Sequence, residues 1–510
     1  MSFLTNLKKN IEEINSLKMT ENGAIGYSTT GKKLLDMNFN VASYRKSSVY
    51  EIVTDFDQAR AENELLAIMW LFFVRDVRGG LGERRLFRVL FRHLVTVNPE
   101  PARKLLPLIA TYGRWDDLIE TTYETSLWGD AVGIIKNQLA ADVEGCKNGE
   151  PISLLAKWLP SERTSSQKSR RKARSLAADL DMDIKEYNRT LVMLRNHLKI
   201  VETKMSAKQW SEIDYSAVPS KANLLYNSAF LRNDEERRRA YLAALSKGET
   251  KINSSAAFPH DIVHKYGRSG WGYRVAQAVD ETLEGMWKAL PKSKGLENVI
   301  VVCDGSGSMT QTVDVHSRLT ALEVSNALAI YCSQYCKGEY KDKFITFSNR
   351  PQFVDLSGCK TLRDKLAVSY AHDEMSGTNI EKVFDIILKS AIQSGADQND
   401  LPQSVLVISD MEFNAPYCTT GTKPSKTLFD TISSRYEDHG YKMPHLVFWN
   451  VNSRTKTIPI TQNDMGVTLV SGFSTGIMQM VTNGQTDPYM NLVETITGER
   501  YKPIMEILEK

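Results

Sequence analysis

The chain has 510 residues, of which 42% are hydrophobic and 25% are charged, and its formal net charge is +3. This composition excludes disordered and collagen-like chains, and the length predicts two or three domains because single cores stop growing near about 250–300 residues. The longest apolar run, Leu65–Val74, is about half of the roughly 20 residues that a membrane helix needs, so we expect no contact with a membrane.

Two further features concern the compartment. The N-terminal segment has no apolar core followed by small residues, so it does not resemble a signal peptide. The six cysteines are spread along the chain without the density of a secreted disulfide scaffold. We therefore expect a cytoplasmic protein that is a monomer.

Residues 1–290 are predicted to be helical almost throughout. In Glu83–Val95, apolar residues recur every three or four positions opposite four arginines, which is the pattern of an amphipathic helix. Pro99 and Pro101 end this pattern, and further helical segments follow as far as Gly272–Leu290. Many helices of about 10–18 residues with short connections predict stacked antiparallel pairs, as in HEAT-like α-solenoids. No clean repeat period is visible, so an irregular helical bundle is the alternative.

Positive charge is concentrated in this helical part. Residues 1–290 contain 43 Lys and Arg against 36 Asp and Glu, whereas the remaining residues contain 21 against 25. The densest run, Lys157–Arg174, has one acid, Glu162, and serines that can also donate to phosphate oxygens. We predict that the run binds a nucleic-acid backbone, and the alternative is a solvated charge run. The predicted contact residues are Lys157, Arg163, Lys168, Arg170, Arg171, Lys172 and Arg174.

After the linker Pro291–Gly295, strands are predicted to alternate with helices. Asn298–Cys303 and Ser404–Ser409 are short runs of β-branched and other apolar residues, typical of strands buried on both faces. A helix is expected at Arg318–Cys336, and a further strand at His445–Val451. This alternation predicts a doubly wound, Rossmann-like parallel sheet.

Oxygen-bearing side chains follow these strands. The first strand ends in the sequence DGSGS, whose two glycines permit a tight loop, and the strand Ser404–Ser409 ends in an aspartate. Ligands collect at the carboxyl ends of parallel strands, and carboxylate and hydroxyl oxygens suit Mg²⁺. We predict a Mg²⁺ site, with Mn²⁺ or Ca²⁺ as alternatives; an ordinary Gly/Ser-rich loop is the other interpretation of DGSGS. The predicted ligands are Asp304, Ser306, Ser308, Thr378 and Asp410.

Patterns of catalytic residues do not accompany these loops. The sequence contains neither a GxxxxGK[ST] phosphate loop nor an HExxH motif, and hydrolysis needs a general base or an activated nucleophile. The histidine closest to Thr378 is His372, six residues earlier. Asp373 and Glu412 are nearby acids that either join the water shell of the metal or are ordinary loop carboxylates. We expect that the protein is not an enzyme.

The order Asp-x-Ser-x-Ser, then a Gly-Thr loop, then an aspartate at a later strand end resembles the metal-ion-dependent adhesion site of von Willebrand factor A domains. The resemblance implies that Ser306, Ser308 and Thr378 coordinate the metal directly. It implies that Asp304 and Asp410 act largely through bound waters. In that family the metal also accepts an acidic residue of a partner protein.

A helical part followed by such a domain resembles the Ro autoantigen family, whose N-terminal module is called TROVE. Several stretches resemble more closely an uncharacterised family of Ro-like proteins, described mainly as a domain of unknown function. They are Thr20–Gly31, Arg75–Phe87, Tyr112–Leu118, Ala156–Glu162 and Lys204–Ser220, and the likeness covers nearly the whole chain. It implies that helical repeats close into a ring around a basic hole, that RNA binds this hole and the outer surface, and that the A-like domain bridges the ends of the ring.

The expected domains are a helical TROVE-like repeat domain at 1–290, a von Willebrand factor A-like domain at 291–485, and a C-terminal extension at 486–510 that packs back on the helical domain. The expected function is a non-catalytic RNA-binding scaffold. It would bind structured or misfolded noncoding RNA through the helical domain and an acidic protein partner through Mg²⁺. The alternative is a metal-dependent protein–protein assembly adaptor without RNA.

Overall fold

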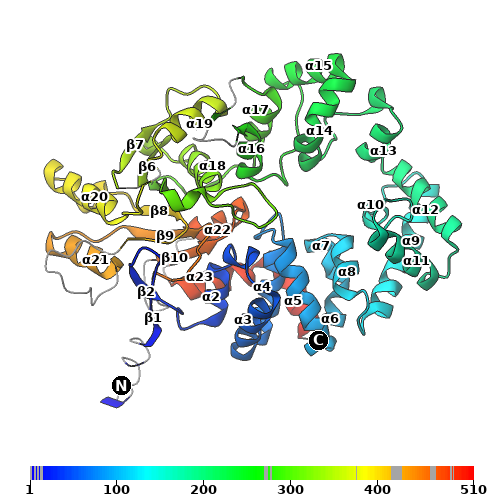
Figure 1. Cartoon of the computed structure of the whole chain (residues 1–510), viewed down its shortest axis with the longest axis horizontal. Coiled ribbons are helices and arrows are strands. Elements are labelled where there is room, and N and C mark those ends of the chain that lie inside the picture. Colours follow the sequence, from blue (N-terminus) through cyan, green and yellow to red (C-terminus); the bar gives the residue numbers. More distant parts are fainter. Residues whose placement is uncertain are drawn as a thin grey trace. The chain divides into compact units, whose positions relative to one another are not determined.

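The computed structural model describes residues 3–509 apart from 5–6, 8–10, 12–14, 269–273, 276–277, 348, 375, 415–427, 460–466, 483–484 and 486. Contacts divide the chain into two compact units (Figure 1). The unit called here the α/β unit consists of Met1–Ala67 and Ala257–Gly498. The unit called here the helical unit consists of Ile68–Ala256 and Glu499–Lys510. An α part and an α/β part are therefore both present, as expected.

A six-stranded sheet forms the centre of the α/β unit in the described residues, with the strand order β10-β9-β8-β5-β6-β7 (Figure 1). Neighbouring strands are parallel except for β6 and β7, which are antiparallel. The sheet is thus mixed rather than purely parallel, because the short connection between β6 and β7 permits only a hairpin. The strands are β5 (Val299–Asp304), β6 (Lys343–Phe347), β7 (Gln352–Asp355), β8 (Ser404–Ser409), β9 (His445–Asn450) and β10 (Val467–Ser471).

Helices cover this sheet. Helix α18 (Ala321–Ser333) is buried along its whole length, because it packs on β5 and β8 and is itself covered by α16 (Pro259–Tyr266). A helix buried on all sides has no polar face to show in its sequence. The other helices of the unit include α2 (Lys33–Phe39), α3 (Val49–Glu62), α17 (Glu281–Lys288), α19 (Leu362–Ala371), α20 (Glu381–Ser394), α21 (Leu428–Asp438), α22 (Met478–Thr482) and α23 (Pro488–Ile496).

The N-terminal residues belong to the α/β unit, although they were expected in the helical domain. Helix α2 has a buried apolar face and packs against β10 and α23, and the side-chain amide of Asn450 donates to Phe39 O at 2.8 Å. Strands β1 (Leu17–Met19) and β2 (Ile25–Tyr27) form a hairpin that the sequence did not predict. The physical reason for the different division is that the apolar face of α2 finds its partner on the sheet.

The helical unit contains the predicted amphipathic helices. In α5 (Arg84–Val97), all five apolar residues predicted to share a face are buried. The run Leu65–Val74 lies within α4 (Glu64–Arg75), and among the described residues no helix combines the length and the apolar character needed to cross a bilayer. Further helices are α6 (Pro99–Leu105), α7 (Ile109–Tyr112), α8 (Trp115–Thr122), α9 (Trp128–Lys147), α10 (Leu155–Trp158), α11 (Gln167–Asp179), α12 (Ile184–His197), α13 (Val201–Ser206), α14 (Ser220–Asn233) and α15 (Glu235–Ser246).

The end of the chain is shared between the units. Helix α23 packs on β10, whereas α24 (Lys502–Leu508) packs on α6. The ring of Tyr501 stacks on Tyr112 with 5.6 Å between the centroids, and its hydroxyl donates to Asp76 at 3.2 Å. Arg500 also pairs with Asp76. Only the residues from 499 onward of the expected extension 486–510 therefore pack on the helical unit.

A buried ion-pair network connects three helices of this unit. The carboxylate of Asp117, which is fully buried, accepts from Arg75 Nε at 2.7 Å and from Arg88 Nε at 2.6 Å. It also accepts from the backbone N–H of Arg114 at 3.0 Å, at the beginning of α8. Because Arg75 is itself buried, Asp117 is its counter-charge as well as the connection between α4, α5 and α8.

Replacing Asp117 by alanine is expected to lower the free energy of unfolding of the helical unit by about 3–5 kcal/mol, because Arg75 is left buried without its carboxylate. Urea unfolding, read from hydrogen exchange in α4 and α5, measures the change. Asp130→Ala is the control, because the pair of Asp130 with Arg103 (3.3 Å) is on the surface and contributes little. Equal stability of the two variants would contradict the interpretation.

Candidate metal site

The loop after β5 is fixed by the carboxylate with which the strand ends. Asp304 is fully buried; its Oδ1 accepts from the backbone N–H of Ser306 at 2.9 Å and its Oδ2 accepts from the hydroxyl of Ser409 at 2.6 Å. Ser409 ends β8, the parallel neighbour of β5. The pairing of these two strands therefore holds Asp304 in one orientation at the carboxyl edge of the sheet.

The two serines of the loop continue this network to a second aspartate. The hydroxyl oxygens of Ser306 and Ser308 are 3.0 Å apart, and the hydroxyl of Ser308 lowers the pKa of the nearby carboxylate of Asp410. Asp410 follows β8 directly and is fully buried. Four of the five predicted ligands thus lie close together at this edge of the sheet.

The loop before α20 carries Thr378, the fifth predicted ligand. The backbone N–H of Gly307 donates to Ser376 O at 2.9 Å, which joins the DGSGS loop to the loop before α20. Thr378 is buried and is tied to the loop after β8, since the N–H of Asn414 donates to its carbonyl at 2.8 Å. The side-chain amide of Asn22 donates to Thr378 Oγ1 at 3.4 Å. The structure therefore gathers Asp304, Ser306, Ser308, Thr378 and Asp410 at the loops of one sheet edge.

Burial governs the charge state of these acids. Burial raises the pKa of Asp304, and the neighbouring charge of Asp410 raises it further. Burial likewise raises the pKa of Asp410, against the opposing effect of Arg454. Two buried carboxylates this close are costly to ionise together, so a cation among them would be stabilised. Carboxylate and hydroxyl oxygens are the donors that Mg²⁺ prefers, and the residues present fit such an ion.

Asp373 is a third acid beside the same loop; the residue is half-buried, and its Oδ1 is enclosed. Its Oδ2 accepts from the amide of Asn326 at 3.1 Å, whereas its Oδ1 has no hydrogen-bond partner in the described part of the chain. Burial raises the pKa of Asp373 to about 7. A Cβ on Gly305 would lie 2.7 Å from this Oδ1, so the glycine in the loop is required by the approach of the acid. Asp373 is thus an inner acid of the site region and not an exposed loop carboxylate.

Two further residues belong to this site: Glu412, named from the sequence as a nearby acid, and Arg454, which the sequence did not indicate. Glu412 is fully buried and its Oε1 accepts from the backbone N–H groups of Arg454 and Thr455, both at 2.8 Å. Arg454 Nη1 donates to Asp410 Oδ2 at 2.8 Å. Arg454 lies in the loop that follows β9, whose carboxyl end is at the same sheet edge. The rule that ligands collect at strand ends is the signal by which it could have been found.

Histidine and cysteine do not contribute to this site. Over the ranges that the structure describes, no group of three or more His, Cys, Asp or Glu residues is arranged to hold a metal ion. The candidate site is of a different kind, because hydroxyl oxygens supply most of its donors. His372 Nδ1 is hydrogen-bonded to the carbonyl of Val368 in its own helix, at 2.8 Å.

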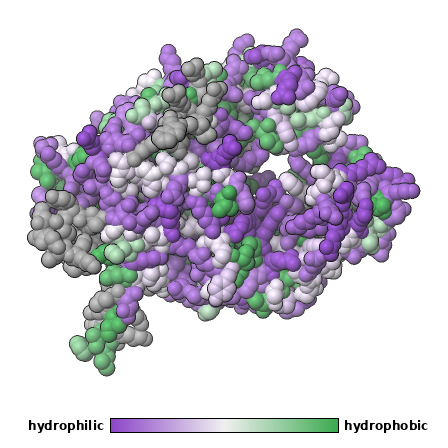
Figure 2. All heavy atoms as spheres, in the orientation of Figure 1, coloured by the Kyte–Doolittle hydropathy of each residue, from purple (hydrophilic) through white to green (hydrophobic). Residues whose placement is uncertain are grey.

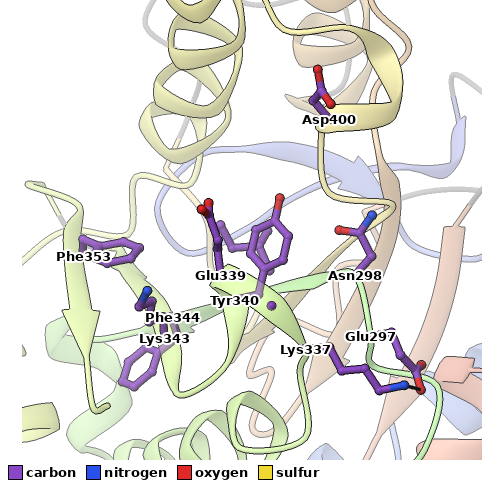
Figure 3. Close-up of a pocket in the computed structure, with 11 residues that line it drawn as sticks. Glu297, Asn298, Lys337, Glu339, Tyr340, Lys343, Phe344, Phe353 and Asp400 are labelled. Carbon is purple, nitrogen blue, oxygen red and sulfur yellow. Dashed lines mark ion pairs between the residues drawn. The ribbon is translucent and has the colours of Figure 1, made fainter. Parts of the chain in front are cut away.

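A pocket of about 550 Å³ lies at the other edge of the sheet (Figure 3). The pocket lies where β5 and β6 begin. Figure 3 shows Lys337 directed toward Glu297, with which it forms an ion pair of 2.9 Å. Its lining mixes acids, lysines and the rings of Tyr340 and Phe353. None of the predicted ligands lines this pocket, so it is separate from the candidate metal site.

The predicted basic run has a mixed outcome in the helical unit. Lys172 differs from the expectation, because it is buried and forms an ion pair with Glu120. Arg174 pairs with Glu162 at 2.8 Å, and Arg171 with Glu124 at 3.5 Å. The remaining members are Lys157, whose ammonium lies over the Trp158 ring at 5.6 Å, and Arg163, Lys168 and Arg170, which are exposed and form no ion pair in the described residues.

Two basic depressions lie beside these exposed cations, on a surface that Figure 2 shows to be largely hydrophilic over α11 and α12. One, of about 370 Å³, has four cations and two acids in its lining: Arg92, Glu120, Tyr123, Glu124, Lys168, Arg171 and Lys172. The other, of about 640 Å³, has three cations and no acid in its lining: Arg163, Lys185, Asn188, Arg189, Val192 and Met193.

Comparisons with known proteins place both features in regions of unknown function. Residues 298–501 match the Domain of unknown function (DUF7788), and residues 126–293 match the Domain of unknown function (DUF2828). The chain is 28% identical over 509 residues to "Uncharacterized protein L728" of Acanthamoeba polyphaga mimivirus, covering 92% of this chain and 85% of that protein. The five predicted ligands fall in the first match and the basic run in the second. These likenesses agree with an uncharacterised family, while the TROVE and von Willebrand factor A assignments stay proposals.

The raised pKa of Asp373 makes a prediction about pH. An acid whose pKa is higher in the folded state than its ordinary value of about 4 stabilises the fold at low pH, and this stability is lost as the pH rises to about 7. In EDTA, the α/β unit should therefore become less stable from pH 5 to pH 8. The expected contribution of Asp373 is about 3 kcal/mol.

Urea unfolding followed by hydrogen exchange in β5 and β8 measures this dependence. Asp373→Asn should make this dependence shallower and raise the stability at pH 8, because the amide cannot ionise; the raised pKa values of Asp304 and Asp410 account for the dependence that remains. The control is Asp355→Asn in the edge strand β7, at a carboxylate that is exposed. A stability that rises with pH, equally in the wild type and in Asp373→Asn, would contradict the prediction.

Proposed function

We propose that the α/β unit is a divalent-cation-dependent docking module of the von Willebrand factor A type. The observation that carries the proposal is that Asp304, Ser306, Ser308 and Asp410 lie together at the carboxyl edge of the sheet, with the Thr378 loop joined to them. Mg²⁺ would be held by the three hydroxyls, with the two aspartates acting through bound waters. A carboxylate from a protein partner would complete the shell.

The donor set supports docking more than hydrolysis. The ligands proposed to coordinate directly are neutral hydroxyls, and the two carboxylates act through bound waters, so an acidic side chain is a suitable further direct ligand of a divalent ion. A catalytic site would need a base within hydrogen-bond reach of the reacting water, and the nearest histidine in sequence, His372, is hydrogen-bonded within its own helix. We therefore propose a non-catalytic role, in the cytoplasm, for a monomeric protein.

Mg²⁺ or Mn²⁺ should bind the wild-type protein with one site, and Asp304→Ala should abolish binding. Thr378→Ala should weaken it by about tenfold, as expected for the loss of one direct ligand. Isothermal titration calorimetry measures the affinities, and Asp355→Asn is the matched control with one carboxylate removed elsewhere in the unit. Equal binding by the wild type and Asp304→Ala would contradict the proposal.

We further propose that the helical unit binds RNA, as a HEAT-like repeat module similar to that of the Ro proteins. The specific observation in favour is the pair of basic depressions, together with the exposed Lys168 and Arg170 that form no ion pair in the described residues. Positive charge not neutralised by nearby acids binds a phosphate backbone with release of counterions. Structured or misfolded noncoding RNA is the proposed ligand class.

A variant in which Arg163, Lys168 and Arg170 are all changed to Gln should bind single-stranded RNA about tenfold more weakly at 100 mM salt. Its dependence of log Kd on log salt should also be shallower, because fewer phosphates are contacted. Fluorescence anisotropy with a labelled oligouridine measures both. The control is Arg237→Gln/Arg239→Gln on α15, where the arginines pair with Asp234 and Glu235.

The alternative is an assembly adaptor without RNA, in which both units bind proteins. An absence of RNA affinity, combined with intact Mg²⁺ binding, would favour this adaptor. The ratio of absorbance at 260 and 280 nm after purification gives an early indication, because co-purified nucleic acid raises it. A low ratio and a flat salt dependence would remove the RNA proposal and leave the docking proposal untouched.

A further inference from the structure

The turn between β1 and β2 lies on the loops of the candidate metal site, some 390 residues away in the chain. The hydroxyl of Thr20 donates to Phe413 O at 2.6 Å, and the amide of Asn22 donates to Glu412 O at 2.6 Å. An isolated antiparallel β-bridge pairs Gly23 with Asn414. These contacts fix the turn against the loop that carries Asp410, so the carboxylate of Glu21 is held at the rim of the site.

Arg454 connects this rim to the interior of the site. Its Nη1 donates to Asp410 Oδ2 at 2.8 Å, and its Nε donates to Glu21 Oε2 at 2.7 Å; its Nη2 also contacts Glu21. Asp410 is fully buried, whereas the side chain of Glu21 is 55% exposed. One guanidinium is thus shared between an inner carboxylate and an outer carboxylate.

The guanidinium of Arg454 and a bound divalent cation would both be attracted to the carboxylate of Asp410. In the arrangement proposed above, Asp410 accepts from the water shell of the metal, and the metal adds two positive charges close to the charge of Arg454. Like charges this close repel strongly in a region of low effective dielectric constant. Each cation therefore weakens the binding of the other to Asp410.

We infer that Arg454 is a built-in competitor of the divalent cation for Asp410, and that Glu21 sets the strength of this competition. The inference rests on the proposed metal site and adds its regulation by the N-terminal turn. Glu21 draws the guanidinium outward and neutralises it, and so favours the metal. Any partner or modification that removes Glu21 from Arg454 returns the full positive charge to Asp410 and lowers the affinity for the metal.

The competition predicts opposite effects for the two residues. Arg454→Gln should bind Mn²⁺ about tenfold more tightly than the wild type, because one nearby positive charge is removed. Glu21→Gln should bind it about threefold more weakly, because Arg454 loses its outer counter-charge. Arg454→Lys keeps the charge and should stay within about threefold of the wild type. In the double variant Glu21→Gln/Arg454→Gln, the effect of Glu21 should be largely lost.

Isothermal titration calorimetry with MnCl₂ and MgCl₂ on the full chain provides the test. Lys365→Gln is the matched control, because it removes one charge from the same unit at an ion pair with Asp342. A merely structural role of Arg454 would make Arg454→Gln bind the metal more weakly, so tighter binding is the result that distinguishes competition from support. Thermal unfolding without metal confirms that the variants are folded, and Glu21→Gln serves if Arg454→Gln does not fold.

The outcomes separate the two proposals. If the wild type binds Mn²⁺ and Arg454→Gln binds it equally or more weakly, the competition is overturned and the metal site stands. Tighter binding in Glu21→Gln also overturns the competition. If only Arg454→Gln binds the metal, the competition is supported in its strongest form. If neither binds, both proposals fall.

Discussion

The parallel pairing of β5 with β8 is the constraint on which the rest of the α/β unit depends. It sets Cys303 opposite Ile408, so that the next residues, Asp304 and Ser409, meet and form the 2.6 Å hydrogen bond between a buried carboxylate and a buried hydroxyl. The strands are buried and apolar along their length, so a slip by one residue would turn every side chain to the other face of the sheet. The core therefore fixes where the polar residues at the edge must lie.

The same register creates an electrostatic cost at that edge. It places Asp304 and Asp410, both fully buried, close enough that the charge of Asp410 raises the pKa of Asp304. Two unit charges about 4 Å apart repel by about 4 kcal/mol at an effective dielectric constant of 20. Hydrogen bonds to Asp304 from the backbone N–H of Ser306 and from the hydroxyl of Ser409 reduce this cost but bring no positive charge. Only a cation can neutralise the negative charge of the two carboxylates. Among the described residues, Arg454 supplies such a cation at Asp410.

Features of the fold and the site that depend on neighbouring residues in the sequence could be predicted, whereas those that depend on contacts between distant residues could not. Strands β5 and β8, the DGSGS loop and the aspartate after β8 depend on local patterns, and so do the amphipathic helices such as α5, whose apolar face is buried as expected. The contact between the β1–β2 turn and the loop after β8 joins residues some 390 positions apart, and no local pattern encodes it. The antiparallel pairing of β7 with β6 depends on the short turn between them, which permits only a hairpin.

The same reasoning explains the outcome in the basic run. Charge counting treats the seven cations of Lys157–Arg174 as equivalent, but α11 turns Lys172 inward, beside Ala173, to the carboxylate of Glu120 more than 50 residues earlier. A cation that already has a buried partner costs more to redirect to a phosphate than an exposed one. The exposed residues Arg163, Lys168 and Arg170 remain available to a phosphate backbone. Arg163 and Lys168 line two separate depressions.

Arg454 and Lys172 both show that a partner from a distant part of the chain decides what a charged residue can bind. In the helical unit, Glu120 forms an ion pair with Lys172, a cation that the sequence suggested was exposed and available to a ligand. In the α/β unit, a cation that the sequence did not single out is placed against an acid that was expected to serve a metal. In each case the decisive partner comes from a distant part of the chain, and it changes what the residue can bind without changing the fold. The composition of a site is thus readable from the sequence, whereas its net charge depends on tertiary partners.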